Sequence, residues 1–228
     1  MATSKLSQLL GLEKSPVAIS FVDQAPQGVA RASSPEPASC GYWRRATEGE
    51  VFYTVAEDHK NCPIGAHTHN VPLSQEEQRQ AASLVETMVG LSYLKMEEIA
   101  RIPARNAPLR VAVYAPLELA PVPPDVVVVR GNARQLMLLA EAAVAAGVAG
   151  AGPTLGRPTC AALPVAIESG RTAMSLGCVG NRVYTRAQDD EAYVAIPGER
   201  LGALEAQLAV IKRANDELEK FHRSRLEP

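Results

Sequence analysis

The sequence predicts a single α/β or α+β domain in which mixed sheets are covered by helices and a helix-strand-loop unit is duplicated about a pseudo-twofold axis. Short β-branched runs alternate with segments of helical periodicity along the 228 residues. A chain of this length can bury a sizeable core without disulfide staples. Two stretches also resemble each other, and each holds two of the four cysteines.

The repeated unit begins and ends with a cysteine. Cys40 and Cys160 are each followed eight residues later by Glu, then by Gly and a strand-like run. The second cysteine of each copy, Cys62 or Cys178, lies close before a Gly. We therefore expect one domain over 1–228, with related halves at about 16–70 and 125–196 and a C-terminal helix over 199–222.

The elements before the first cysteine follow from leucine spacing and composition. Leucines at helical spacing predict a helix over 4–12, and the apolar run over 16–22 predicts a buried strand. Residues 23–39 are rich in Pro, Gly, Ala and Ser, which predicts a loop.

The first cysteine unit reads as helix, strand and loop. Ser39 is a candidate N-cap for a short helix over 40–47, which would place Cys40 near positive helix-end amides and lower its thiol pKa. Residues 50–56 predict a strand, and the polar stretch 57–65 predicts a loop of the kind that carries sites.

The segment between the two units begins with a capping box, in which Ser74 precedes Glu77 by three residues. This predicts a helix from there to about 88, and a second helix is expected over 95–100. The apolar run over 109–115 predicts a strand.

The second half opens with four consecutive valines over 126–129, which predict a central strand buried on both faces. A helix is expected over 132–145. The Gly-rich stretch 147–158 lacks the Lys-Ser/Thr of a P-loop and is interpreted as a connector. After the second cysteine unit, residues 193–196 predict a strand, and 199–222 predict a long amphipathic helix.

Composition limits the classes of function. The net charge of −2 gives no electrostatic reason to expect a nucleic-acid partner. The longest apolar stretch is broken by prolines and charges, so we expect no membrane span, and no signal peptide is evident. A cytoplasmic location follows, where cysteines serve as thiols, metal ligands or redox groups rather than disulfides.

The four cysteines are the predicted cofactor and metal ligands: Cys40, Cys62, Cys160 and Cys178. All four occupy equivalent places in the two copies, although free cysteines also serve as small buried hydrophobes. Soft thiolates favour an iron–sulfur cluster, 4Fe–4S, ahead of zinc, with haem as a further alternative.

The candidate catalytic residues are His59, Asp58 and Arg182. Asp58 could tune His59 as a general base, against a purely structural histidine–carboxylate hydrogen bond. Arg182 could bind an anionic group, against a structural ion pair. His67 and His69 would lie on one side of a strand and could extend a metal site, although this spacing alone is a weak signal.

Several motifs resemble the domain-of-unknown-function 169 family of bacteria and archaea. They are Ala56-Glu57-Asp58-His59, Cys62-Pro63-Ile64-Gly65-Ala66, Pro124 to Val129 with Gly131 to Gln135, Ser175 to Arg182, and Ile196-Pro197. The resemblance runs from Leu9 to about Leu208 and implies that the cysteine motifs are family features. Asn181 stands where the family has Ser, and His67 and His69 stand where an apolar segment is usual.

Three hypotheses of function follow. The first is an iron–sulfur protein with a redox or catalytic role, its cluster held between the duplicated halves. The second is a cysteine/histidine-dependent enzyme, and the third binds haem, a metal or a small anion without turnover. The partner would be a small-molecule substrate or an electron-transfer protein. The C-terminal helix packs on its own domain or, in a homo-oligomer, on a second subunit.

Overall fold

The structure is a computed structural model that describes residues 3–150 and 156–226. Part of the Gly-rich connector expected over 147–158 therefore lies outside the described residues. Within the described part of the chain, seven strands form one sheet with the order β2-β3-β4-β1-β5-β7-β6. All neighbours in the sheet are antiparallel except β2 and β3, so the sheet is mixed. The predicted α/β class with a mixed, helix-covered sheet is confirmed.

The strands agree with most of the sequence-based boundaries. Their bounds are β1 Val17–Val22, β2 Ala30–Arg31, β3 Phe52–Val55, β4 Val111–Pro116, β5 Val126–Asn132, β6 Ala173–Ser175 and β7 Glu191–Pro197. At the centre, β1 pairs with β4 on one side and with β5 on the other, where Val17 lies opposite Val128 and Ile19 opposite Val126.

The valine run of β5 packs on both faces of the sheet, as predicted. Val126 and Val128 belong to the core on one face, and Val127 and Val129 belong to the core on the other. Successive side chains of a strand point to opposite faces, so a strand covered on both sides needs an unbroken apolar run.

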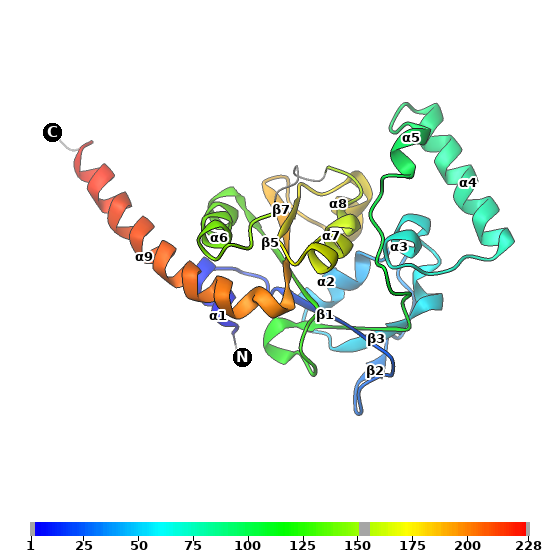
Figure 1. The fold of residues 1–228 in the computed structure, drawn as a ribbon, viewed down its shortest axis with the longest axis horizontal. Helices are drawn as coiled ribbons and strands as arrows, with labels where there is room; N and C mark the ends of the chain where they lie inside the picture. The colour runs from blue at the N-terminus through cyan, green and yellow to red at the C-terminus, as the bar shows by residue number, and fades with distance from the viewer. Residues whose placement is uncertain (1–2, 151–155, 227–228) are drawn as a thin grey trace.

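Helices cover both faces of the sheet (Figure 1). Their bounds are α1 Lys5–Leu10, α2 Gly41–Thr47, α3 Pro63–Thr68, α4 Gln75–Gly90, α5 Met96–Ile99, α6 Ala133–Ala145, α7 Ala162–Ser169, α8 Val179–Thr185 and α9 Leu201–Ser224. Helices α1, α6 and α9 contribute to the core on one face, and α2 and α7 to the core on the other. In the described residues no helix is both long and apolar enough to cross a membrane.

The elements of the two halves follow the same order. Outward from the β1–β5 pair, one side of the sheet runs β1, β4, β3 and the other β5, β7, β6, with antiparallel neighbours throughout. Each cysteine unit is a helix, a strand and a second helix: α2, β3 and α3 in the first, α7, β6 and α8 in the second. The duplication stays a prediction, with which this order agrees.

The second cysteine of each unit was expected on a loop after a strand, and the structure differs. Cys62 is the N-cap of α3 and Cys178 is the N-cap of α8. Pro63 at the first position of α3 explains the helix, because its fixed φ suits a helix start. The expectation that His67 and His69 share one side of a strand is wrong, since this segment is helical and ends at His69.

The buried face of α6 supplies a test of the core. Leu139 is fully buried between the sheet and α9, whereas Met137 on the same helix is 45% exposed. Leu139→Ala should lower the free energy of unfolding by about 2–5 kcal/mol in urea titrations. Met137→Ala should change it by less than about 0.5 kcal/mol. Equal effects of the two substitutions would contradict the assigned face.

Candidate functional site

One cavity of about 600 Å³ lies between the two cysteine units and the α4–α5 hairpin. All four cysteines of the chain line it. Cys40 and Cys160 are nearly buried in its wall, and Cys62 and Cys178 are partly exposed. The structure thus brings to one place the four residues that the sequence singled out.

Each cysteine stands at or near the start of a helix. Cys40, Cys62 and Cys178 are the N-caps of α2, α3 and α8. Cys160 lies in the 3₁₀ turn that leads into α7. Cys62 Sγ accepts a hydrogen bond from the backbone N–H of Gly65 at 3.3 Å. The cavity wall is therefore built from the first turns of four helices, two from each half.

The cysteines do not form a metal centre. Among the residues that the structure describes, no group of three or more His, Cys, Asp or Glu side chains is placed to hold a metal ion. The predicted iron–sulfur protein with a 4Fe–4S cluster is therefore wrong, and so are zinc and haem as alternative cofactors. Thiols spaced around a cavity of this size share its surface but do not converge on one point.

Burial also keeps two of the thiols protonated. Desolvation raises the pKa of Cys40 to about 12, and nearby Cys62 adds to that shift. Burial raises the pKa of Cys160 further. The expectation that a helix N-terminus lowers the Cys40 pKa is wrong, because loss of hydration outweighs the helix-end amides. A neutral thiol is a poor metal ligand and a poor nucleophile.

The α4–α5 hairpin supplies a mostly apolar part of the cavity wall. Leu84 and Met88 lie one turn apart on α4, and Leu94, Ile99 and Ile102 extend the same wall. Helices α4 and α5, which the structure describes in full, contain no buried residue. In Figure 1 the hairpin projects from the body.

Two charged side chains line the cavity among its described residues, and they pair with each other. Arg157 Nη2 lies 3.3 Å from Glu98 Oε2, with the two side chains 44% and 45% exposed. The Arg157 guanidinium also lies over the ring of Tyr93, 4.9 Å from its centroid. Neither residue could be singled out from the sequence, because an ion pair between positions 98 and 157 depends on the fold.

His59 lies behind the cavity wall in a buried hydrogen-bond chain. Its Nδ1 is 3.0 Å from the hydroxyl of Ser39, which lines the cavity, and its Nε2 is 2.9 Å from Thr54 Oγ1. Thr54 donates to the carbonyl of Ala112 at 3.5 Å, so Nε2–H donates to Thr54 and Nδ1 accepts from Ser39. The histidine thus holds the Ser39–Cys40 corner against the sheet.

Gly65 allows α3 to approach that corner closely. A Cβ atom at position 65 would lie 2.1 Å from Ser39 Oγ and 2.8 Å from Ser39 Cβ. No side chain fits at that separation, so only glycine lets the α3 start and the Ser39 turn form adjacent parts of the wall. This is the structural reason for the Gly that follows Cys62.

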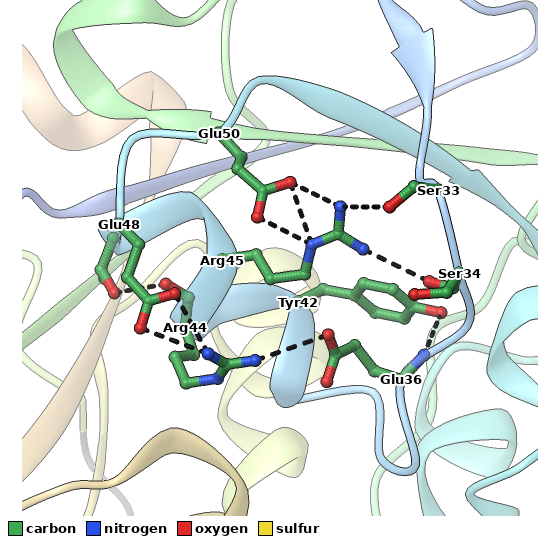
Figure 2. Close-up of polar contacts among 9 residues, drawn as sticks. Ser33, Ser34, Glu36, Tyr42, Arg44, Arg45, Glu48 and Glu50 are labelled. Carbon is green, nitrogen blue, oxygen red and sulfur yellow. Dashed lines mark hydrogen bonds and ion pairs between the residues drawn. The ribbon is translucent and has the colours of Figure 1, made fainter.

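A second polar network fixes the loop that leads to Cys40 (Figure 2). Arg45, only 7% exposed, donates from Nε to both carboxylate oxygens of Glu50 at 3.0 and 3.1 Å, and from its Nη atoms to Ser34 O and Ser33 Oγ. Arg44 pairs with Glu36 and Glu48. These contacts hold residues 33–36 against α2.

The other two predicted catalytic residues, Asp58 and Arg182, form ion pairs and hydrogen bonds outside the cavity. Asp58 forms an ion pair with Arg31 at 2.8 Å and accepts from the backbone N–H of Val55. Arg182 donates to the carbonyls of Leu176, Gln188 and Glu191. Neither they nor His59 belong to the described cavity lining, so a catalytic role for the three stays a prediction.

Asn181 lines the cavity and is 1% exposed. Its amide lies beside Cys40 and lowers the pKa of that thiol, although burial outweighs the effect. Neither amide atom makes a hydrogen bond of ordinary geometry with a described residue. The sequence marked this position as a departure from the family pattern, and the structure places it in the wall.

The buried histidines predict a loss of stability in acid. Burial lowers the pKa of His69 to about 4 and that of His59 well below its ordinary value of 6.5. Between about pH 6.5 and 4 the unfolded chain binds more protons than the folded one, so stability falls as the pH falls. For His69 alone the loss is about 3 kcal/mol.

Urea titrations at pH 7 and pH 4.5 would measure this loss. His69→Gln should reduce the difference between the two pH values, and His67→Gln, at an exposed position, should leave it as in the wild type. An unchanged pH dependence in His69→Gln would contradict the burial of a neutral imidazole.

The thiols should react with iodoacetamide in order of their exposure. At pH 8 the partly exposed Cys62 and Cys178 should be alkylated before Cys40 and Cys160, as peptide mass spectrometry would show. For Cys40, a pKa of about 12 instead of 9.0 reduces the thiolate fraction about a thousandfold. In guanidinium chloride all four should react alike. Fast labelling of Cys160 in the folded protein would contradict its burial.

Comparison with known proteins places the chain in a family. No curated protein and no solved structure shows significant similarity to it. A family model does match, over residues 5–207, and it spans both halves of the sheet, all four cysteines and the α4–α5 hairpin. The chain therefore belongs to the DUF169 family, described as Uncharacterised ArCR, COG2043.

Proposed function

We propose that this protein binds a mostly apolar small organic molecule in the cavity between the two cysteine units and the α4–α5 hairpin. The observation that carries the proposal is the cavity itself. Its volume of about 600 Å³ is in the range of small-molecule sites, and most of its described lining is apolar. The polar groups of the lining include Ser39 and Asn181 near the helix starts and the Glu98–Arg157 pair.

The four cysteines are proposed as residues that contact the ligand. Protonated thiols are weakly polar and polarisable, so they suit an apolar body better than water does. Cys62 and Cys178 offer the more exposed sulfur-bearing side chains, one from each half. In this role the cysteines form a surface and need not converge on an ion.

The hairpin supplies the energetic reason for a ligand. Leu84, Met88 and Ile99 face the cavity from helices that contain no buried residue. Apolar surface removed from water contributes roughly 25 cal/mol per Å². A bound apolar molecule would cover these side chains and stabilise the hairpin against the body.

Titration with N-phenyl-1-naphthylamine, a neutral apolar fluorophore, would test the proposal. Its emission should rise on binding to the wild type. Ile64→Trp, which fills the cavity from α3, should weaken binding at least about tenfold. Val183→Trp is the matched control, because Val183 is 66% exposed on α8 and is not among the described lining residues.

Two results would refute the proposal: no binding by the wild type, or equal binding by both tryptophan variants. Circular dichroism and the urea midpoint would establish that each variant is folded. A loss confined to Ile64→Trp would locate the ligand in the cavity.

A further inference from the structure

We propose that the ion pair between Arg157 and Glu98 determines the charge selectivity of the cavity, which admits neutral molecules in preference to anions and cations while the pair is intact. The inference deepens the proposed function, because it names the charge class of the ligand. Its test does not depend on ligand binding.

The pair joins the hairpin to the body at the lining of the cavity. Glu98 belongs to α5 in the hairpin, and Arg157 belongs to the segment that leads into Cys160 on the body. The two side chains line the cavity and are nearly half exposed, which places them near its open side. A molecule that enters there passes both charges.

Both partners are held in place by further contacts. Glu98 also accepts a hydrogen bond from the backbone N–H of Lys95 at 2.8 Å. The Arg157 guanidinium lies over the ring of Tyr93 at 4.9 Å. The bond from Lys95 and the contact with Arg157 lower the pKa of Glu98, so its carboxylate stays charged. The pair is therefore intact at neutral pH.

The charges of Glu98 and Arg157 cancel only while both residues are present. No other charged side chain is found among the described residues of the lining, so the opening carries one cation and one anion side by side. Removal of Glu98 would leave Arg157 to attract anions, and removal of Arg157 would leave Glu98 to attract cations. The two changes must act on charged molecules in opposite directions.

The cysteines report this selectivity directly. Because all four line the cavity, the rate of thiol labelling in the folded protein reports access of a reagent to the cavity. Three methanethiosulfonate reagents form a matched set: the neutral methyl, the negatively charged sulfonatoethyl and the positively charged trimethylammonium-ethyl compounds. The quantity measured is the labelling rate of each charged reagent divided by that of the neutral one.

Glu98→Gln should raise the anionic ratio and lower the cationic ratio, each by about threefold to tenfold at low salt. Arg157→Gln should shift both ratios the other way. Gln at position 98 can still accept from the Lys95 N–H, so the start of α5 is preserved. Glu97→Gln is the control, since it removes an exposed charge from the same turn outside the described lining.

Opposite shifts in the two variants, absent from Glu97→Gln and reduced by added salt, would support the proposal. Shifts in the same direction would overturn it, because they would reflect a loosened hairpin rather than charge. So would ratios that match the control. If the naphthylamine fails to bind while the ratios shift oppositely, the proposed function fails and the selectivity of the pair stands.

Discussion

The antiparallel pairing of β1 with β5 at the centre of the sheet is the contact on which the rest of the structure depends. It joins the two halves through Val17–Val128 and Ile19–Val126, whose side chains are all buried in one core. The outer strands of each half extend from this pair. Each cysteine unit is attached to its own half. The β1–β5 register therefore sets where the two cysteine units lie relative to each other.

The cavity walls are fixed by polar groups that lie behind them. His59 holds the Ser39 corner through Thr54, and Arg45 holds residues 33–36 through Glu50. Buried polar groups cost free energy unless they are paired, so these networks specify one arrangement of the wall. They explain how Arg45, and His59 that the sequence singled out, contribute to the site without touching its interior.

Much of the fold could be predicted from the sequence. The valines of β5, the capping box at Ser74 and the amphipathic pattern of α9 reflect local preferences that the packing does not oppose. The short helices α3 and α8 could not be predicted as well, because six or seven residues carry too little periodicity. Cys62 and Cys178 were consequently expected on loops rather than at helix starts.

For the site, the sequence indicated which residues gather but not how closely. The paired cysteines do share one cavity, yet ligation depends on separations of a few ångströms that no spacing in the chain encodes. The prediction of a lowered Cys40 pKa is wrong for a similar reason. A helix cap can be recognised in the sequence, whereas the burial that raises the pKa of Cys40 cannot. Glu98 and Arg157 meet only through the fold.

The α4–α5 hairpin is inserted between α3 and β4 in the first half, whereas only a short turn joins α8 to β7 in the second. This insertion makes the two sides of the cavity different in construction. One side of the cavity is made of helix starts anchored to the sheet, and the opposite side is made of helices without a core of their own. A molecule bound there as proposed would meet helix starts at one end and hairpin side chains at the other.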